Sequence, residues 1–307
     1  MDLSVVIVSY NVREFLSRCL VSLLRTMPAH LSSEIIVVDN ASQDGSVEFV
    51  RGLFPQVQLI VNDQNRGFTA ASNQGLQLAR GRHLFLLNPD TLIREGAMAR
   101  LIECLEKPGV AMVGPKLVYP DGRLQHSAFR FPSLMQIFLD HFPFHPGLVD
   151  STLNGRYPRR RYEQGEPFQI DFPLGAAMLA KREALDQVGL LDEGFFMYCE
   201  EIDWSMRFRR AGWQIWCEPR AEIVHYVAQS TGQNWGASLV ALHRSRFRLY
   251  QKYYSSSFQC TARGIVAAGM RKELLLARWG RPRSQERETL TRAYRQVLAL
   301  ADGREAA

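Results

Sequence analysis

The sequence predicts an α/β protein with a mostly parallel, Rossmann-like sheet and helices on both of its faces. Three observations lead to this fold class. Short apolar runs alternate with segments of helical periodicity through the first 113 residues. Most of these apolar runs are too continuous for a half-exposed strand, so both of their faces should be covered. Repeated strand–helix–strand units of this kind form parallel sheets with helices on either side.

The first two strands and the helix between them follow from local pattern. Leu3–Ser9 is an apolar run that predicts a buried strand. Asn11 is a predicted N-cap with Glu14 three residues later, and the apolar residues that follow recur at helical spacing. Glu34–Asp39 predicts the second strand. The next short helix should be capped by Ser46, after the Asp-Gly turn at 44–45.

The next units repeat this order. Val57–Val61 predicts a third strand, and Phe68–Arg80 predicts a helix that ends at Gly81. His83–Leu87 is the fourth strand. A further helix is marked by apolar residues between Met98 and Leu105, and the strand after it is Val110–Val113.

The pattern changes after Tyr119. Residues 130–168 are rich in Pro, Phe and Arg, which predicts a loop-rich insertion. Regular pattern returns at Phe172, followed by a predicted helix over Glu201–Ala211 and a strand over Trp213–Cys217. Residues 237–300 are predicted to be largely helical and Arg-rich.

These shifts suggest a division of the chain into domains. We expect one domain over residues 1–235, with a ligand-binding half at 1–115 and a second half at 116–235. Residues 236–307 should form a helical, Arg-rich extension.

Composition narrows the function classes. The chain has 307 residues, 46% apolar and 22% charged, as is ordinary for a soluble globular protein. The net charge of +6 suits an anionic partner, but much of the excess is Arg on predicted helix faces, which favours a solvated basic face. A nucleic-acid-binding protein is disfavoured because no recognised signature accompanies the charge. The five cysteines are widely spaced without a C-x-x-C pair, so they indicate neither a zinc site nor a disulfide framework.

The sequence also bears on location. The first apolar run is a strand rather than a signal peptide, and no run approaches the roughly 20 residues that span a bilayer. We therefore expect a cytoplasmic protein, or one that rests on the inner face of the membrane.

Polar residues follow the predicted strands, where ligands bind in parallel α/β sheets. The short segments concerned are Tyr10-Asn11, Asp39-Asn40, Asn62-Asp63 and Asn88-Pro89-Asp90.

Asn88-Pro89-Asp90 comes directly after a buried strand. Taken alone, N-P-D-T is an ordinary turn in which Asp90 or Thr91 caps the next helix. In the functional interpretation, Asp90 is a hard oxygen ligand for Mg²⁺ or Mn²⁺, and Asn88 orients a phosphate or a sugar hydroxyl.

Two further segments could meet a nucleotide. Asp39 can accept hydrogen bonds from a nucleoside, although D-N-A-S is also a plausible turn. NRGFTAASNQG at 65–75 carries Arg66 and Asn73 and can present amides and a cation to an anion, or simply begin a helix. No G-x-G-x-x-G follows the first strand, which counts against a dinucleotide-binding oxidoreductase.

An acidic cluster and one histidine complete the candidates. Glu200, Glu201 and Asp203 begin a helix, where negative charge is favourable. The aromatic residues around them would desolvate a carboxylate and raise its basicity, as suits a general base. His225 follows a predicted strand and is either structural or, near Asp90, a metal ligand.

Together, these pieces resemble the family 2 glycosyltransferases, especially their rhamnosyltransferase-like members. Six segments match in the family's order over roughly residues 3–255. They are SVVIVSYN (4–11), VVDNASQDGS (37–46), NRGFTAASNQG (65–75), LLNPDT (86–91), GAAMLAKREALDQVGLLDEGFFMYCEEIDWSMRFRRAG (175–212) and VHYVAQST (224–231).

The resemblance implies a GT-A fold, in which a nucleotide-binding α/β half is joined to an acceptor-binding part, here followed by the C-terminal helices. It implies inverting transfer of a sugar, with dTDP-L-rhamnose as the preferred donor, assisted by Mg²⁺ or Mn²⁺. The acceptor would be a saccharide or a lipid-linked saccharide in cell-surface polysaccharide synthesis. A noncatalytic nucleotide-sugar-binding protein and a transferase that uses a UDP- or GDP-sugar are the alternatives.

The resemblance also assigns residues. Asn88-Pro89-Asp90 matches the family's D-x-D position, with Asp90 as the metal ligand, and His225 matches a position that reaches the metal or the diphosphate. The family's catalytic pair falls on Glu200 and Glu201. Glu201 is the preferred base, with the choice among Glu200, Glu201 and Asp203 open. The nucleotide-sugar site would contain Ser9, Tyr10, Asn11, Asp39, Asn40, Arg66, Asn73, Asn88 and Asp90.

The Arg-rich tail allows two interpretations. Its apolar residues either face an anionic membrane or pack on the core with the basic side chains in solvent. The apolar set is Ile265, Val266, Met270, Leu274 and Leu275, and the basic set is Arg263, Arg271, Lys272 and Arg278.

Overall fold

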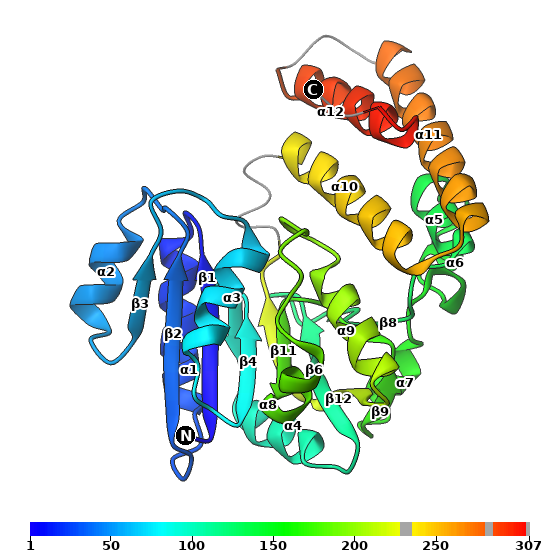
Figure 1. Ribbon diagram of the computed structural model, residues 1–307. Coiled ribbons are helices and arrows are strands. Elements are labelled where there is room, and N and C mark those ends of the chain that lie inside the picture. Colours follow the sequence, from blue (N-terminus) through cyan, green and yellow to red (C-terminus); the bar gives the residue numbers. More distant parts are fainter. Residues whose placement is uncertain (228–234, 280–284, 305–307) are drawn as a thin grey trace. The chain divides into compact units, whose positions relative to one another are not determined.

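A computed structural model describes residues 1–227, 235–279 and 285–304 (Figure 1). Its contacts divide the chain into two compact units. Unit 1 contains residues 1–130, 157–196 and 200–230, and unit 2 contains residues 131–156, 197–199 and 231–307. The predicted boundaries at 115 and 235 stay predictions, but the contacts group residues 131–156 with the C-terminal helices.

Unit 1 is built on a ten-stranded sheet whose main path runs β3-β2-β1-β4-β11-β6-β12-β5, with β7 and β9 pairing β6 and β12. The first four strands of this path are parallel, as the repeated β-α-β pattern predicts. β11 is antiparallel to β4 and β6. The ten strands are β1 Leu3–Ser9, β2 Ser33–Asp39, β3 Gln58–Val61, β4 His83–Leu87, β5 Thr91–Ile93, β6 Val110–Val118, β7 Leu124–Gln125, β9 Phe168–Ile170, β11 Ala177–Lys181 and β12 Gln214–His225.

Helices cover both faces of this sheet, and a small separate sheet pairs β8 (Ala128–Phe129) with β10 (Phe172–Pro173). The helices of unit 1 are α1 Arg13–Thr26, α2 Ser46–Leu53, α3 Phe68–Leu78, α4 Ala97–Leu105, α7 Arg159–Glu163, α8 Arg182–Val188 and α9 Glu200–Arg210.

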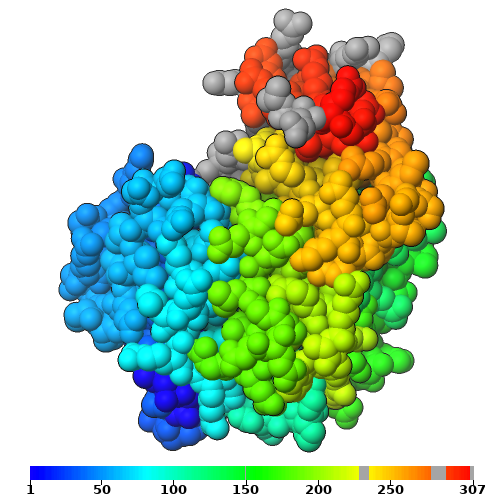
Figure 2. All heavy atoms as spheres, viewed as in Figure 1, coloured from blue at the N-terminus to red at the C-terminus, as the bar shows by residue number. Residues whose placement is uncertain are grey.

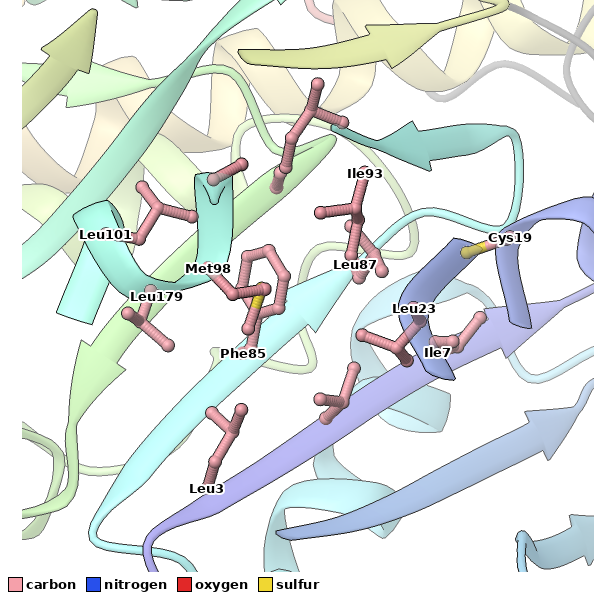
Figure 3. Packing of buried hydrophobic residues seen from close by; sticks show 14 of the residues in the cluster. Leu3, Ile7, Cys19, Leu23, Phe85, Leu87, Ile93, Met98, Leu101 and Leu179 are labelled. Carbon is pink, nitrogen blue, oxygen red and sulfur yellow. The ribbon is translucent and has the colours of Figure 1, made fainter. Parts of the chain in front are cut away.

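Alternate residues of the strands point to opposite faces of the sheet, and a hydrophobic core lies on each face. On one face, Phe85 and Leu87 of β4 pack with Ile7, Leu23 and residues of α4 (Figure 3). On the other face, Leu84 and Leu86 pack with residues of α3, α8 and α9. Burying a side chain of this size contributes about 1.5–3 kcal/mol, so the continuous apolar run of β4 is explained by a core on each side.

The predicted helix starts need correction. Asn11 is not the N-cap of α1: the helix begins at Arg13, no side chain caps it, and Asn11 has a φ of 52°. Ser46 is the first residue of α2, and its hydroxyl bonds the Asp44 side chain rather than capping the helix. Neither Asp90 nor Thr91 begins a helix, because Thr91 opens β5. Asn11 and Asp90 instead contact distant residues, whereas Ser46 and Thr91 bond neighbours two and three residues away.

The second half of unit 1 holds the other differences. The strand predicted over Trp213–Cys217 extends to His225 as β12. The predicted loop-rich insertion contains four short helices, of which α7 belongs to unit 1 and the other three belong to unit 2. Of the six matched segments, only 228–231 in the last one lie outside the described residues.

Unit 2 is helical. The tail helices predicted over 237–300 are present as α10, α11 and α12, and they are joined by three short helices from the insertion. Together they are α5 Leu134–His141, α6 Pro146–Val149, η1 Thr152–Asn154, α10 Trp235–Tyr253, α11 Ser256–Trp279 and α12 Gln285–Ala301. In the described part of the chain, none of the helices is long and apolar enough to cross a membrane.

The apolar residues of α11 follow the core-packing interpretation only in part. Val266 and Met270 are buried at 1% and 3% exposure, so they belong to the core of unit 2. Leu275 and its neighbour Leu276 are exposed.

Two histidines are buried together in unit 2. His141 on α5 and His243 on α10 stack with ring centroids 5.4 Å apart. Gly269 of α11 makes room for this pair, because a Cβ there would lie 2.7 Å from the His141 ring. Burial, followed by the nearby Arg246 cation, lowers the pKa of His141 to about 4 and also lowers the pKa of His243.

Acid is therefore expected to destabilise the protein. The stability that depends on neutral His141 is fully present above the unfolded-state pKa near 6.5 and is lost as pH falls toward about 4, a loss on the order of 3 kcal/mol. Urea unfolding at about pH 7.5 and about pH 5 measures this change. His243→Phe should reduce the pH dependence, whereas the exposed His30→Gln should leave it as in the wild type. Identical pH dependence in all three proteins would contradict the prediction.

Candidate active site

The ends of three parallel strands bring the predicted nucleotide residues to one edge of unit 1. Ser9 of β1 and Asp39 of β2 are register partners. β4 is parallel to β1 on its other side, so Asn88 and Asp90 follow it at the same edge. The sequence prediction that these residues gather beyond the strand ends is confirmed by this register.

Asp39 is buried with half of its carboxylate unused. It is 1% exposed, and its Oδ1 accepts a hydrogen bond of 2.9 Å from the amide of Ser42. Within the described residues, Asp39 Oδ2 and the Ser9 hydroxyl are buried without a hydrogen-bond partner. Because leaving such atoms unpaired costs about 1–3 kcal/mol each, they indicate a place for a ligand's hydrogen-bonding groups.

The loops after β1 and β2 hold one another in place. The Asn11 amide donates to the Ser42 hydroxyl at 3.0 Å, and Asn11 Oδ1 accepts from the Gln43 amide at 2.7 Å. Tyr10 lies half-buried between Ser9 and Asn11. Asn11 is therefore a residue that shapes this loop pair, and its positive φ is part of that turn.

Asn40 organises the next loop. Its Nδ2 donates to Asn65 Oδ1 at 2.9 Å, and its Oδ1 accepts from Asn62 and from the amide of Arg66, both at 3.0 Å. These contacts occupy its side chain and support a positioning role. The Arg66 side chain is exposed and can reach an anion.

Asn73 also has a structural use. Its Nδ2 donates to the Leu191 carbonyl and to Glu193 Oε1, both at 2.9 Å, and its Oδ1 accepts from the Leu191 amide. It ties α3 to the segment that precedes the acidic helix, and these two parts of the chain lie next to one another on the surface in Figure 2.

A glycine fixes the start of α3. Gly67 has a φ of 82°, and a Cβ on it would lie 2.5 Å from the carbonyl oxygen of Phe196. That carbonyl accepts from the Phe68 amide at 2.8 Å. The backbone of Phe196 therefore lies against the first turn of α3, and only glycine at position 67 permits this close approach.

Asp90 and His225 meet at the end of β4. His225 Nε2 lies 3.3 Å from Asp90 Oδ1, and both residues are nearly fully buried. His225 Nδ1 lies 3.1 Å from Gln125 Oε1, so the ring is held from both sides. When Nδ1–H donates to Gln125 Oε1, Nε2 carries the lone pair with which an imidazole binds a metal.

This pair fits a divalent cation. Two ligands about 2.1 Å from one octahedral ion and at right angles to one another lie about 3.0 Å apart, close to the observed 3.3 Å. Among the described residues no cluster of three or more His, Cys, Asp or Glu side chains could hold a metal. The chain would thus supply two ligands, and Mg²⁺ or Mn²⁺ commonly completes such a shell with substrate phosphates and water.

Backbone contacts bring the acidic helix toward the end of β4. The amide of Asn88 donates to the Ala176 carbonyl at 2.8 Å. A Cβ on Gly175, the next residue back along the chain, would lie 3.8 Å from the Cβ and Cγ of Glu201 and 3.9 Å from Glu200 Oε1. Two adjacent residues, Gly175 and Ala176, therefore connect Asn88 at the end of β4 to Glu200 and Glu201 at the start of α9.

The two glutamates differ in environment. Glu200 is 5% exposed, and its Oε2 has no hydrogen-bond partner among the described residues. Burial, followed by the charge of Glu201, raises the pKa of Glu200 well above its ordinary value. Glu201 is half-buried, and its Oε2 is one of the buried atoms.

Asp203 is separated from this pair by its partner. It is fully buried, and Arg207 Nε lies 2.9 Å from its Oδ2 in an i,i+4 ion pair within α9. Because its carboxylate is used in this ion pair, Glu200 and Glu201 remain as the candidates for the base.

The approach to α9 is strained. Tyr198 and Cys199 have φ values of 69° and 65°, which non-glycine residues seldom adopt. The preceding carbonyl of Met197 accepts a 2.7 Å hydrogen bond from Ser245 of α10, which anchors the turn within unit 2. Such strain is commonly kept at functional sites.

Sequence reasoning missed the supporting residues. Gln125 lies in the two-residue strand β7, whereas Gly175 and Ala176 lie in the turn before β11, and the roles of all three depend on contacts with distant residues. Only the glycine in GAAM carried a local signal, and that signal was compatible with any turn.

Comparison with known proteins identifies the family of this chain. Residues 4–189 match the model of a family described as glycosyl transferase family 2. The chain is 28% identical to an N-acetylglucosaminyl-diphospho-decaprenol L-rhamnosyltransferase of Mycobacterium tuberculosis, over 98% of each protein.

Solved structures show the same fold. A mannosyltransferase of Pyrobaculum calidifontis, in complex with GDP-Man and Mn²⁺, matches with a TM-score of 0.59 at 16% identity over 98% of this chain and 86% of that one. GalNAc-T7 with UDP, GalNAc and Mn²⁺ matches with a TM-score of 0.57 at 19% identity over 73% of this chain and 43% of that one.

Proposed function

This chain belongs to glycosyl transferase family 2 and has the GT-A fold, and from this premise we propose that it transfers L-rhamnose from dTDP-rhamnose to a hydroxyl of a lipid-linked saccharide. The reaction would be inverting and would serve cell-surface polysaccharide synthesis. The similar mycobacterial protein is named for rhamnosyl transfer to an N-acetylglucosaminyl-diphospho-decaprenol acceptor, which supports the choice of donor sugar and acceptor class.

One observation carries the proposal. A buried carboxylate–imidazole pair, Asp90 and His225, follows β4, and Asn88 at the end of the same strand bonds Ala176, whose neighbour Gly175 lies near Glu200 and Glu201. A pair of metal ligands and a carboxylate base are the groups needed to separate a diphosphate from a sugar and to deprotonate an acceptor. A noncatalytic nucleotide-sugar-binding protein would need neither.

Asp90 and His225 would hold Mg²⁺ or Mn²⁺, and a bound cation there would neutralise the charge that gathers on the departing diphosphate. Gln125 would keep the imidazole oriented with Nε2 toward this position. The Asp39 carboxylate would accept a hydrogen bond from the nucleoside, and the Ser9 hydroxyl would donate one to it. Both would use atoms that have no partner among the described residues. Arg66 would add a positive charge at the same edge.

Glu201 is the base in this mechanism. Its carboxylate takes the proton of the acceptor hydroxyl while the acceptor oxygen bonds to the anomeric carbon. The bond from that carbon to the diphosphate oxygen breaks, and the diphosphate leaves with the electron pair. A single displacement on the face opposite the leaving group inverts the anomeric configuration. Buried Glu200, whose pKa is raised, would stay protonated and leave the negative charge of the pair on Glu201.

The direct test is transfer by the purified chain. It should convert dTDP-L-rhamnose and an N-acetylglucosaminyl-diphospho-lipid analogue into a disaccharide product in the presence of Mn²⁺ or Mg²⁺, with dTDP released in equal amount. NMR of the product should show the anomeric configuration inverted relative to the donor. UDP- and GDP-sugars, tested in parallel, should react much more slowly. Binding of a nucleotide sugar with no transfer to any acceptor would favour the noncatalytic alternative.

Asp39→Asn is expected to weaken donor binding without unfolding the protein. The substitution can keep the acceptor that bonds the Ser42 amide and replaces the unpaired Oδ2 with a donor. Loss of one hydrogen bond to a charged group, about 1.5–3 kcal/mol, corresponds to about 10- to 100-fold weaker binding. Calorimetric titration with the donor measures this, while kcat at saturating donor should change less. The exposed Asp63→Asn is the matched control, and donor affinity equal in both variants would contradict the assignment.

A further inference from the structure

Unit 2 exposes several large apolar side chains. Phe144 is 67% exposed, the highest value among the large exposed hydrophobic residues of the described chain. Met135 and Phe138 of α5 are 50% and 38% exposed, and Leu275 and Leu276 of α11 are 54% and 59% exposed. These five residues are called the unit 2 apolar patch. Exposed apolar groups that gather in this way commonly mark an interaction site.

The contacts around the patch connect its parts. The Phe138 ring lies 5.1 Å from that of Phe142 and 6.3 Å from that of Phe144, between ring centroids. Lys272 of α11 places its Nζ 5.2 Å from the Phe142 ring and donates to the carbonyl of His141 at 2.6 Å. Leu275 and Leu276 follow Lys272 by three and four residues, so they lie on the same side of α11. The opposite side of α5 is used for the core, where Ile137 and Leu139 are buried.

The charge of the two units is strongly unequal. The residues of unit 2 include 15 Arg and Lys against 7 Asp and Glu, a net charge of +8. Unit 1 has 22 against 24, a net charge of −2, so the basic excess of the whole chain belongs to unit 2. The acidic residues close to the patch in sequence are paired: Asp140 with Arg246 at 2.9 Å, Asp150 with Arg156 at 3.4 Å, and Glu273 with Lys272 at 3.0 Å.

We propose that the unit 2 apolar patch docks on an anionic lipid surface. Aromatic side chains settle at the level of the lipid headgroups, and exposed leucines reach the boundary of the acyl chains. The net charge of +8 on unit 2 favours a surface that carries lipid phosphates. A second copy of the chain is a poorer occupant, because two surfaces with a net charge of +8 repel one another.

This inference rests on the proposed function only for its purpose, which is to bring the enzyme to a lipid-linked acceptor. The docking itself needs no sugar donor, so the two can fail separately. A vesicle experiment tests the docking, and transfer to a water-soluble acceptor analogue tests the function.

Co-sedimentation with vesicles is the measurement. The wild-type chain should bind phosphatidylcholine vesicles that contain about one third phosphatidylglycerol, and it should bind pure phosphatidylcholine much less. The double variant Phe144→Ser, Leu276→Ser should bind the anionic vesicles about tenfold more weakly or worse. Leu53→Ser, Leu78→Ser is the matched control, because these unit 1 residues are 64% and 52% exposed and lie outside the patch. Both double variants should keep wild-type transfer to the soluble analogue.

Three results would overturn the proposal. The first is no binding of the wild type to anionic vesicles at low salt. The second is equal loss in the patch variant and in the control variant, or no loss in either. The third is a dimer of the wild type, seen by light scattering without lipid, that the patch variant abolishes, since the occupant of the patch would then be a second copy.

Discussion

Asp90→Asn is expected to lower kcat/KM about a thousandfold while leaving the protein folded. Asp90 is the only carboxylate in contact with His225 Nε2 among the described residues, and it is 6% exposed. The amide has nearly the same volume, so it removes the charge that would bind a cation without opening a cavity. The measurement is the initial rate over a titration of Mn²⁺, with thermal unfolding to verify the fold. Part of the loss should be recovered at high Mn²⁺ if weakened metal affinity contributes to it.

Two controls separate the metal role from a general effect of charge. Asp63→Asn removes an exposed carboxylate that follows β3 at the same sheet edge, and it should keep the wild-type rate. Gln125→Leu leaves both ligands in place but removes the acceptor that orients His225, so it should weaken Mn²⁺ binding about 10- to 100-fold. Full activity of Asp90→Asn, or a wild-type rate that persists in excess EDTA, would sink the metal assignment.

The sequence predicts the strands that are buried on both faces, because such strands are continuous apolar runs. β1, β2 and β4 are continuous apolar runs because each feeds a core on either side of the sheet. The antiparallel placement of β11 between β4 and β6 was not predictable. The five residues AMLAK favour a strand, but the local sequence does not indicate which strands it pairs with or in which direction it runs.

The helix starts illustrate the same limit. Asn11 and Ser46 have the residue types of caps, and both have found other partners, in Gln43 and Asp44. A cap stabilises a helix by only about 1 kcal/mol, so another hydrogen bond of similar strength can displace it. Residue type sets which hydrogen bonds are possible, and the fold decides which are made.

For the site, the strand ends carried most of the information. Asp39 and Asp90 were predicted because polar residues directly after buried strands must lie at one edge of a parallel sheet. The role of Asp203 could not be separated from that of its neighbours, since all three acids occupy the first turn of one helix. The ion pair with Arg207 is what distinguishes it, and the i,i+4 spacing is compatible with that pair without requiring it.

Glu201→Gln and Glu200→Gln are expected to give opposite results. Glu201→Gln should reduce kcat about 10²- to 10⁴-fold, the usual contribution of a general base, with little change in donor affinity. Glu200→Gln should cost less than about tenfold, because a glutamine resembles the protonated carboxyl that burial and the charge of Glu201 favour at position 200. Comparison of kcat and of donor binding in the two variants, at one pH near neutrality, measures this difference.

The pH profile adds a second readout to the same pair. In the wild type, protonation of the pair on acidification should abolish transfer, since the base must be ionised to accept the acceptor's proton. The raised pKa of Glu200 arises in part from the charge of Glu201, so the two carboxyls titrate as a unit and Glu200→Gln should move the acid limb. Loss of activity in Glu200→Gln with activity retained in Glu201→Gln would exchange the two roles. Wild-type rates in both variants would remove the carboxylate base from the mechanism, because Asp203 is held by Arg207 and no other acid of α9 is free to replace it.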